Sequence, residues 1–508
     1  MNAPAQTLGK RQNESRYTAA MSAVSSSPIA LLLGAVLLIA PLFQSGKTPL
    51  ALLALELLAL ALLMCVLWRP ERLRALPALQ KAALAGLVLL PLLYLVPLPP
   101  ALAALAPGRA DHVAALALAT DGRLGAPRTL SLYPLETLSG LLKLLLPVAV
   151  FLAASVLPTR RLQQLALLVT GMAGVQAVLG LLQYGGGLEV QGLVAGESSA
   201  VGTYTSRNNF AGFLLLALMP VLALLVLAVG RREAGAISAR QRVAFWSSVR
   251  GHRAFGHAAL ALLLLLGIVF SRSRAGIALT MLGVVLVAVL LSRRIGGRSG
   301  RFGPVGAVAS MALGLAVAIG LAPVLQRFTL QDPAADGRWT IFAGTLDGIA
   351  RFFPVGAGPG TFQEAFFPFQ DSAHAAYLIN QAHNSYLEWV FDGGLPALLL
   401  VATLLFVYVA RWFGLWVAQE WGEFRYLQVG CGLGLGLMLL HELVDYNLFV
   451  PANMVYFAFL AAVFLHDYRE PLRARGRRES DDAEGNGERR LPPLPSQTSV
   501  PVTNPFMD

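Results

Sequence analysis

Charge is what this sequence has least of. Asp, Glu, Lys and Arg together make up 13% of its 508 residues, whereas hydrophobic residues make up 56% and the mean hydropathy is +0.63. Soluble domains carry roughly 25% charged residues, so the composition excludes an ordinary soluble domain and indicates an integral membrane protein. The formal net charge of +11 would suit a nucleic-acid partner. In a membrane protein, however, such an excess more often marks basic cytoplasmic loops, and we expect no nucleic-acid partner.

Cysteines and metal-binding patterns are scarce too. The two cysteines, Cys65 and Cys431, both lie in apolar runs, so no disulfide framework is expected. The sequence has no DxD pair, HExxH or CxxC, and we therefore predict no metal and no cofactor. Strand-like alternation is absent as well. Because backbone polar groups must be satisfied within lipid, helices are the expected spanning form.

Long apolar runs, by contrast, are abundant. A spanning helix needs about 20 predominantly apolar residues. The candidate runs lie near 28–44, 48–68, 82–104, 138–157, 162–182, 209–229, 257–271, 275–292, 304–324, 395–413, 426–442 and 449–466. The sequence thus predicts an all-α integral membrane protein of about 12 transmembrane helices, with one long, partly helical loop on the outer side.

Lys and Arg gather in alternate loops and at both termini. The positive-inside rule places that side of the protein in the cytoplasm, and an even number of helices agrees with it. The predicted segments are a cytoplasmic N-terminal tail (1–27), transmembrane helices 1–9 (28–324), an outward-facing cap loop (325–394), transmembrane helices 10–12 (395–467) and a disordered cytoplasmic tail (468–508).

The cap loop, residues 325–394, is the one long polar interruption of the chain. Long loops without obvious structure are usually functional or disordered, and the many Phe, Trp and Tyr residues of this one argue against disorder. Its glycine-rich stretch 356–360 suggests a rigid turn with exposed N–H groups, which in other proteins cradles phosphate. No Lys-Ser/Thr follows, so the stretch is not a nucleotide loop.

Two arginines lie on the side that the topology signal disfavours. Arg272 and Arg274 belong to the tight outward turn 271–276 (SRSRAG). The planar fork of a guanidinium matches phosphate oxygens, so two such forks predict a pyrophosphate site. The alternative is a pair of headgroup anchors or a salt bridge to the cap loop.

A second polar element opens a helix from the same side. Residues 203–212 (TYTSRNNFAG) place Arg207 at the predicted helix start. Helix N-termini attract anions, so Arg207 would add charge to an anion site. The alternative is an ordinary cap in which Asn208 or Ser206 satisfies the first turn.

Histidine is the strongest catalytic candidate in the cap loop. Asn384 and Glu388 flank His383 at an apparent helix start, where a neutral imidazole would remove a proton from an attacking hydroxyl. The alternative is a surface histidine. His441 and Asp445 lie four residues apart and would share a face if both were helical. We interpret them as a buried polar cluster that fixes two helices, with a brace or an acid/base pair as the alternative.

Together these motifs resemble the O-antigen ligase and O-antigen polymerase superfamily of bacterial membrane glycosyltransferases. The matching elements run from residues 207–209 (RNN) through 271–276, 337–339 (GRW), 354–362 (PVGAGPGTF) and 383–388 (HNSYLE) to 441–453. The resemblance implies a helical GT-C-like fold and an undecaprenyl-pyrophosphate-linked glycan donor. It also implies a metal-independent reaction at the periplasmic face of the bacterial inner membrane.

The resemblance also assigns roles to residues. It makes His383 the catalytic base, and it makes Arg207, Arg272, Arg274 and Arg338 the donor pyrophosphate-binding candidates. The supporting candidates are Asn208, Asn384, Glu388, His441 and Asp445. An acceptor hydroxyl would attack the anomeric carbon, with inversion, and fixed arginines would stabilise the charge that grows on the leaving pyrophosphate.

The acceptor stays open at this point. A ligase transfers finished glycan to lipid A–core, whereas a polymerase joins lipid-linked repeat units into exopolysaccharide or O-antigen; the chain length and the RNN element slightly favour a polymerase. Two other classes compete with a glycosyltransferase: a transporter or flippase of lipid-linked glycan, and a non-catalytic partner in a polysaccharide assembly complex. The expected partners are the lipid-linked donor, an acceptor glycan or lipid A–core, membrane lipids and polysaccharide assembly proteins.

Overall fold

The structure of the chain is a computed structural model. It describes residues 27–68, 73–74, 76–103, 105–119, 121, 129–186, 199–230, 239–295, 310, 337–372, 377–417 and 421–467. The predicted helix at 304–324 and the predicted terminal tails therefore lie, almost entirely, outside the described residues.

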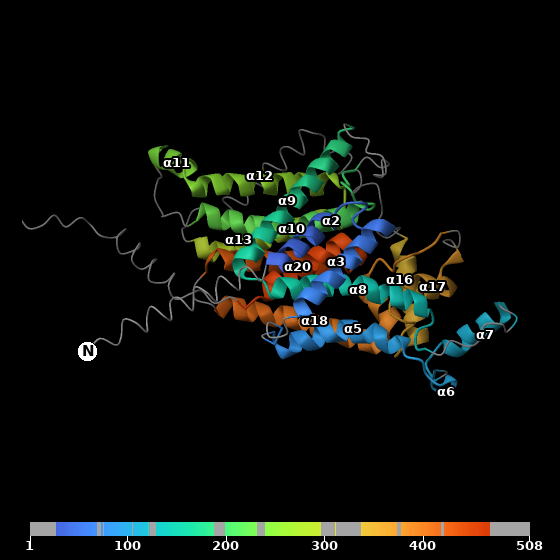
Figure 1. The fold of residues 1–508 in the computed structure, drawn as a ribbon. Helices are drawn as coiled ribbons and strands as arrows, with labels where there is room; N and C mark the ends of the chain where they lie inside the picture. The colour runs from blue at the N-terminus through green and yellow to red at the C-terminus, as the bar shows by residue number, and fades with distance from the viewer. Residues whose placement is uncertain are drawn as a thin grey trace, which may run out of the picture. The chain divides into compact units, whose positions relative to one another are not determined.

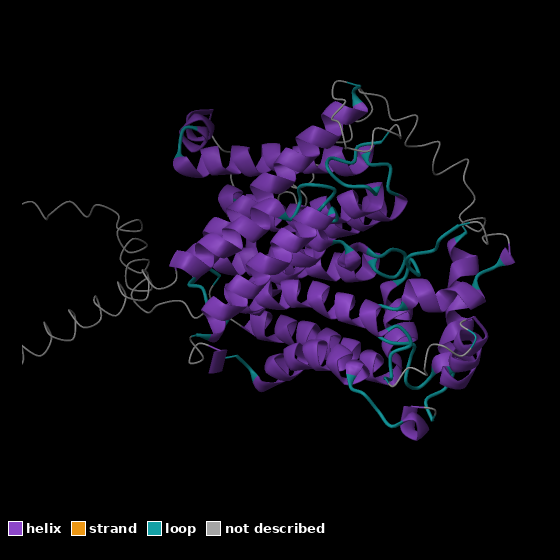
Figure 2. Ribbon diagram, turned by 45° about the vertical axis from the view of Figure 1, so that its right-hand side comes forward, coloured by secondary structure: helices purple, strands orange, loops and turns teal. Residues whose placement is uncertain are grey.

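Helices make up the regular structure of these residues, and no strand occurs among them (Figure 2). The α-helices, in chain order, are α2 (Ser27–Ile39), α3 (Pro49–Leu67), α5 (Ala78–Leu95), α6 (Pro100–Ala103), α7 (Arg109–Ala119), α8 (Pro134–Ser155), α9 (Thr159–Tyr184), α10 (Arg207–Val229), α11 (Ala239–Trp246), α12 (Val249–Phe270), α13 (Arg274–Ile295), α16 (Arg338–Phe352), α17 (Phe362–Phe366), α18 (Ser385–Val417), α19 (Glu423–His441) and α20 (Pro451–Leu465). Two 3-10 turns, η2 (Phe367–Phe369) and η4 (Asn447–Phe449), complete the set.

Within the described part of the chain, 8 helices are long and apolar enough to cross a membrane, and α2 and α20 are shorter apolar helices. The chain is therefore an all-α, multi-pass membrane protein, as its composition predicts. The total of about twelve spans stays a prediction.

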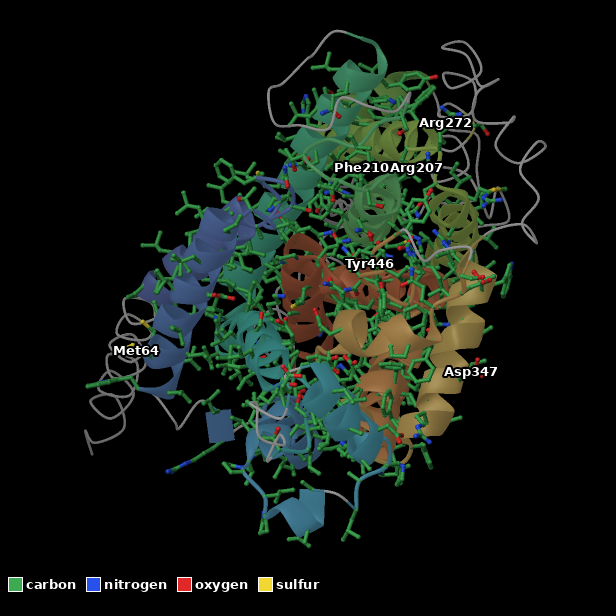
Figure 3. All side chains as sticks on the ribbon, turned by 90° about the vertical axis from the view of Figure 1, so that its right-hand side faces the viewer. Met64, Arg207, Phe210, Arg272, Asp347 and Tyr446 are labelled. Carbon is green, nitrogen blue, oxygen red and sulfur yellow. The ribbon has the colours of Figure 1, made fainter. Side chains whose placement is uncertain are left out.

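Helix α10 forms the centre of the bundle. It packs against α9, α12, α13, α19 and α20, and its sequence is apolar on every side, which is the pattern of a helix surrounded by protein. Helix α3 is equally apolar, yet residues such as Leu53 and Leu57 are exposed in the structure. Such a face is stable against lipid, and α3, on which Figure 3 labels Met64, lies at the periphery of the bundle.

The cap is built on aromatic packing at one end of the bundle, where α16 and α17 lie (Figure 1). Phe352, Phe362, Phe366 and Phe391 form a buried cluster under these helices. Their rings meet mostly edge to face, with centroids 5.5 Å apart for Phe352 and Phe391 and 5.0 Å apart for Phe362 and Phe391. The aromatic residues that argued against disorder thus form the core of the cap.

Helix α18 joins the cap to the bundle and is broken at Gly394. That residue has φ 54° and ψ −142°, and Pro396 follows it. The break frees the N–H of Leu395, which donates to the carbonyl oxygen of Pro354 at 2.8 Å. A Cβ at position 394 would lie 2.1 Å from that same oxygen, so only glycine fits where the cap turn packs on the helix.

Candidate active site

Three predicted residues meet at the cap end of the bundle although they come from three separate segments. Arg338 is the first residue of α16, His383 precedes α18, and Asp445 follows α19. Asp445 Oδ1 lies 3.9 Å from His383 Nδ1, and Asp445 Oδ2 lies 3.7 Å from an amino nitrogen of Arg338. We call these three residues the candidate catalytic cluster. Asp445 lies at its centre, because its two carboxylate oxygens face the Arg338 guanidinium and the His383 imidazole.

The Asp445 side chain is only 2% exposed. Burial by itself would raise the pKa of its carboxyl group, but the neighbouring His383, His441 and Arg338 side chains outweigh burial and lower it. Arg338 is held a second time, because it donates a 2.7 Å hydrogen bond to the carbonyl oxygen of Val444. The charged carboxylate therefore fixes the position of the guanidinium and attracts the imidazole.

The condition for a shared helical face of His441 and Asp445 is not met. Helix α19 ends at His441, and Asp445 lies in the turn that follows Glu442, the C-cap. The two side chains are nevertheless both buried at the same helix end. The tight turn, rather than helical spacing, brings Asp445 back toward the bundle. Neither ring nitrogen of His441 has a hydrogen-bond partner among the described residues.

His383 has an unusual backbone. Its φ is 55°, in the left-handed region, which costs a residue with a Cβ roughly 1–2 kcal/mol. Its side chain is 31% exposed, and its ring packs edge-on against Tyr446, with centroids 4.9 Å apart. Strained, partly exposed residues are typical of functional sites rather than of plain surface.

The two predicted neighbours of His383 shape its loop. Asn384 Oδ1 accepts hydrogen bonds from the N–H groups of Tyr386 and Leu387, at 3.0 and 3.1 Å, and so caps α18. Glu388, which is buried, accepts a 2.8 Å hydrogen bond from the N–H of Ala382. These bonds fix the chain on both sides of His383.

The other predicted arginines lie at the same end of the bundle. Arg207 and Arg274 are the first residues of α10 and α13, and Arg272 lies in the turn before α13 with φ 60°. Figure 3, which views that end, shows Arg207 and Arg272 on the same face of the molecule as Tyr446. All three arginines are half-buried.

Buried hydrogen bonds tie the start of α10 to the segment around the candidate catalytic cluster. Asn453 donates to the carbonyl oxygen of Asn209 at 3.0 Å and accepts from the Tyr204 hydroxyl at 3.2 Å. Ser206 is the N-cap of α10, but its side chain makes no capping hydrogen bond. The alternative interpretation, in which the Ser206 side chain caps the first turn of α10, is therefore not met. Asn208 follows Arg207 in the first turn and is half-buried.

The glycine-rich turn does not present free N–H groups, which corrects the expectation from sequence. The N–H of Gly356 donates to Phe352, and that of Gly358 donates to the carbonyl oxygen of Asp392 at 2.7 Å. The N–H of Gly360 donates to the Asp392 carboxylate, also at 2.7 Å. The turn therefore supports α18 and is not a phosphate cradle.

One cation near the cluster carries no sequence motif. Lys47 lies between α2 and α3, after four consecutive left-handed residues, 43–46, and its amine is 5.7 Å from the centre of the Tyr446 ring. Burial lowers the pKa of Lys47, while the Asp445 carboxylate opposes that effect. A lone lysine in a short loop gave no signal in the sequence.

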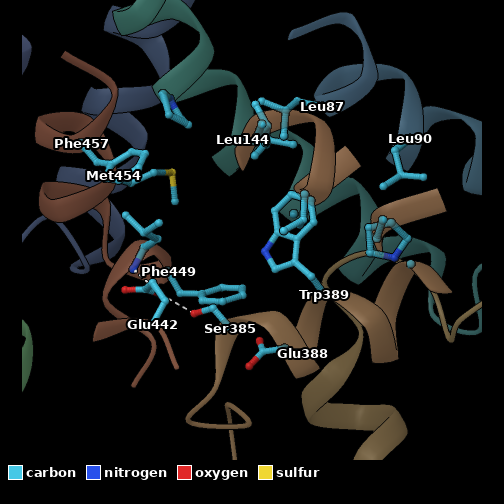
Figure 4. Close-up of a pocket in the computed structure, with 18 of the residues that line it drawn as sticks. Leu87, Leu90, Leu144, Ser385, Glu388, Trp389, Glu442, Phe449, Met454 and Phe457 are labelled. Carbon is cyan, nitrogen blue, oxygen red and sulfur yellow. Dashed lines mark hydrogen bonds between the residues drawn. The ribbon is translucent and has the colours of Figure 1, made fainter. Parts of the chain in front are cut away.

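A cavity of about 500 Å³ is bordered by residues that flank His383 in the chain, Gln381 and Ser385 among them. Its apolar wall comes from α5, α8, α18, α19 and α20, and Figure 4 shows Leu144, Met454 and Phe457 on that wall. Ser385, Glu388 and Glu442 lie at its polar end. Ser385 connects this end to the cluster, because its hydroxyl donates to Glu442 and its N–H donates to the Glu442 carbonyl oxygen at 2.9 Å.

No group of three or more His, Cys, Asp or Glu residues within the described ranges could hold a metal ion. In the comparisons with known proteins, residues 259–402 match the family model described as O-antigen ligase. The matched segment includes Arg272, Arg274, Arg338 and His383, whereas Arg207 and Asp445 lie outside it. No curated protein matches this chain.

Proposed function

We propose that this chain, which carries the O-antigen ligase domain at residues 259–402, is a membrane glycosyltransferase that takes its glycan from undecaprenyl pyrophosphate. The family match supports the resemblance that the motifs predict and a role in polysaccharide assembly. The observation that carries the proposal further is the candidate catalytic cluster, His383, Asp445 and Arg338. It joins a base candidate and a phosphate-binding candidate through one buried carboxylate.

His383 acts as the general base in this proposal. Its Nδ1 faces Asp445, so the carboxylate favours the tautomer with the proton on Nδ1 and leaves the lone pair on Nε2. Nε2 then takes the proton of the acceptor hydroxyl as that oxygen attacks the anomeric carbon. The 3.9 Å separation exceeds a hydrogen bond, and contacts of this kind commonly tighten when substrate binds.

The arginines stabilise the leaving group. As the glycosidic bond breaks, negative charge grows on undecaprenyl pyrophosphate, and fixed guanidinium groups lower the barrier because they bind that charge more strongly in the transition state. Arg207, Arg272, Arg274 and Arg338 supply four such groups at one end of the bundle. In this role they take the place that a divalent metal has in other glycosyltransferases, and direct attack inverts the anomeric carbon.

The proposal places the site at the periplasmic face of the bacterial inner membrane, with both termini in the cytoplasm, because the basic loops lie on the opposite side. The product is a surface polysaccharide. Either repeat units are polymerised into exopolysaccharide or O-antigen, or finished O-antigen is ligated to lipid A–core.

The experiment that tests the function uses purified protein in lipid nanodiscs with radiolabelled undecaprenyl-pyrophosphate repeat units. Either further lipid-linked repeats or lipid A–core is offered as acceptor, with wild type and His383→Ala in parallel. A ladder on the lipid carrier that disappears in the variant identifies a polymerase, and a single transfer to lipid A–core identifies a ligase. In sealed proteoliposomes, movement of donor across the bilayer without bond cleavage would instead establish a transporter, and wild-type activity in His383→Ala would overturn the assigned base.

A further inference from the structure

Helix α16 carries a second apolar face, on the side away from the cap core. Its side chains recur at alternating intervals of four and three residues, so they lie along one line of the helix. The large members, Trp339, Leu346 and Phe353, are 57%, 53% and 47% exposed. We call the whole set the outer stripe: Trp339, Ala343, Leu346, Ala350 and Phe353, the C-cap. Exposed apolar surfaces of this kind mark a contact with a membrane or with another protein.

The outer stripe cannot turn inward, because the opposite face of α16 is locked in the cap. Gly344 and Gly348 are buried there. A Cβ on Gly344 would clash with the carbonyl oxygen of Phe369, and a Cβ on Gly348 would clash with the ring of Phe391. The backbone of α16 therefore lies directly on the cap core, and rotation of the helix would push larger side chains into that space. The stripe stays on the outside of the molecule.

The two flanks of the outer stripe differ in polarity. One flank carries Thr340, Asp347 and Arg351, which are all exposed. The other flank carries Phe342 and Ile349, which are half-buried. A helix with water on its whole outer side would be polar on both flanks. An apolar face between one polar and one apolar flank is instead the pattern of a helix that lies in the surface of a bilayer.

The end of α16 is fixed at a definite height relative to the membrane. The carbonyl oxygen of Pro354, which follows Phe353, accepts the 2.8 Å hydrogen bond from the N–H of Leu395. Leu395 begins the apolar part of α18, a helix long and apolar enough to cross a membrane. From Leu395 to Val417 this part rises about 34 Å, close to the roughly 30 Å of a hydrocarbon core. Leu395 and the end of α16 therefore lie at the boundary of that core.

Lipid reaches the outer stripe along α18. Leu395 and Leu399 are 40% and 59% exposed, and lipid covers such side chains on a spanning helix. Phe353 continues this apolar surface, because the hydrogen bond from Leu395 to Pro354 holds its neighbour against the start of the spanning part. Figure 3, which labels Asp347, shows α16 from its side at the edge of the cap end, so the helix lies across the bundle. A helix in this orientation at the core boundary lies parallel to the bilayer surface.

We propose that α16 is an interfacial helix and that its outer stripe binds phospholipid at the boundary between the headgroups and the acyl chains. Trp339 and Phe353, the aromatic side chains at the two ends of the stripe, suit this level of the bilayer. The partner is the lipid surface itself, and the competing occupant is a second copy of the chain. The inference holds whether or not the chain transfers glycan.

Lipid contact has a consequence for the candidate catalytic cluster. Arg338 is the first residue of α16, and it faces the Asp445 carboxylate and the carbonyl oxygen of Val444. The bilayer holds α16 on one side and the cap core holds it on the other, so the Arg338 guanidinium keeps its place in the cluster. Displacing the stripe from lipid should therefore loosen the turn that carries Val444 and Asp445.

The first test measures what covers the stripe. Spin labels are attached to Leu346→Cys on the stripe, to Asp347→Cys on the polar flank and to Leu57→Cys on the exposed face of α3. The protein carries Cys65→Ser and is held in nanodiscs of phosphatidylcholine and phosphatidylglycerol that accept two copies; Cys431 is fully buried and stays unlabelled. We expect the label at 346 to collide with oxygen, which dissolves in lipid, several-fold more often than with a water-soluble nickel chelate, as the label at 57 does. The label at 347 should show the opposite preference.

Two results would overturn the proposal. A label at 346 that meets the nickel chelate as often as the label at 347 does would place the stripe in water. A label at 346 that meets neither reagent would place protein on the stripe. Spin–spin broadening that disappears when labelled protein is diluted with unlabelled protein would then identify a second copy as the occupant.

A second measurement tests the link to Arg338. Ala343→Glu puts a charge on the stripe, and Thr340→Glu, the matched control, puts the same charge on the polar flank one turn away. Hydrogen exchange of both variants in nanodiscs is followed by mass spectrometry. We expect the α16 peptide and the peptide that contains Val444 and Asp445 to exchange several-fold faster than wild type in Ala343→Glu and at the wild-type rate in Thr340→Glu. Equal exchange in the two variants would contradict the lipid contact, and faster exchange confined to α16 would retain that contact and remove the link to Arg338.

Discussion

Two regions next to the His383 loop differ in the ionisable groups that they contain. On one side, Arg338 and Lys47 surround the buried Asp445, with the arginines at the starts of α10 and α13 at the same end of the bundle. In the second region, the cavity is lined by five carboxyl groups and one lysine. Basic side chains favour an anion such as the leaving group of the proposed reaction, whereas carboxyl groups do not, so the two regions are suited to different ligands.

Removing the proposed base, His383, should have the largest effect, because it would act on the attacking hydroxyl itself. We expect His383→Ala to lower kcat by about 10²–10⁴-fold, the usual contribution of a general base, with little change in donor binding. The measurement is single-turnover transfer from radiolabelled donor. Tyr377→Phe, at an exposed cap position, is the matched control. A His383→Ala rate near that of this control would show that His383 is not the base.

The cationic side should be next in size. Replacing Arg338 by Gln removes one charge that faces the leaving group, and we expect a loss of about 10²-fold in kcat, in the range for one preorganised electrostatic contact. Lysine keeps the charge but not the planar fork, so Arg338→Lys should recover only part of the rate. An Arg338→Gln variant that changes KM for the acceptor and leaves kcat intact would contradict this prediction, because Arg338 would then bind the acceptor and not the leaving group.

Lys47 tests how far the cationic side extends. Its amine is mostly desolvated beside Tyr446, so a bound pyrophosphate would restore an interaction that burial removes. We expect Lys47→Gln to weaken product inhibition by undecaprenyl pyrophosphate roughly tenfold, and Lys47→Arg to restore most of it. Unchanged inhibition in Lys47→Gln would restrict the anion site to the arginines.

The smallest expected effect comes from Glu442, a carboxyl group that lines the cavity. We expect it as a dependence of thermal stability on pH. Burial raises the pKa of Glu442 to about 8 from an ordinary 4.5, against hydrogen bonds from Ser385 and Leu448. A carboxyl group with a raised pKa stabilises the folded state fully below its unfolded pKa, and the contribution is lost as pH rises through the folded pKa. Thermal stability should therefore fall as the pH increases from about 5 to about 9.

The Glu442→Gln variant isolates this effect, because glutamine has no proton to lose. Its melting temperature should depend less on pH than that of wild type over the same interval, while the neighbouring Asp445 and Glu388 still titrate. Parallel curves for wild type and variant, measured by scanning fluorimetry, would show that Glu442 is not the group responsible.

The sequence predicted the class of fold, and its motifs singled out several residues that the structure places at the cap end of the bundle. Long apolar runs predict membrane-spanning helices. The start of a helix, such as α10 at Arg207, can be predicted because polar residues precede an apolar run. The proximity of Arg338, His383 and Asp445 could not be read from spacing, since they come from three segments that only the packing of α16, α18 and α19 brings together. The resemblance, rather than any local pattern, placed them in one prediction.

The errors have local physical causes. His441 and Asp445 would have shared a face only if both were helical, but the helix ends at His441. The glycine turn was expected to expose N–H groups, yet the Asp392 carboxylate and the backbone carbonyl oxygens of Phe352, Phe391 and Asp392 accept them. In both cases a partner distant in sequence, or the end of an element, decided the outcome.

The left-handed backbone of His383 has a consequence for trapping the complex that the proposed function implies. Asparagine tolerates this backbone conformation better than histidine or alanine does, because its short side chain bonds to local backbone. His383→Asn should therefore melt at a higher temperature than His383→Ala while lacking the base. Such a variant would hold donor and acceptor together without turning them over, and its complex is the natural target for electron cryomicroscopy.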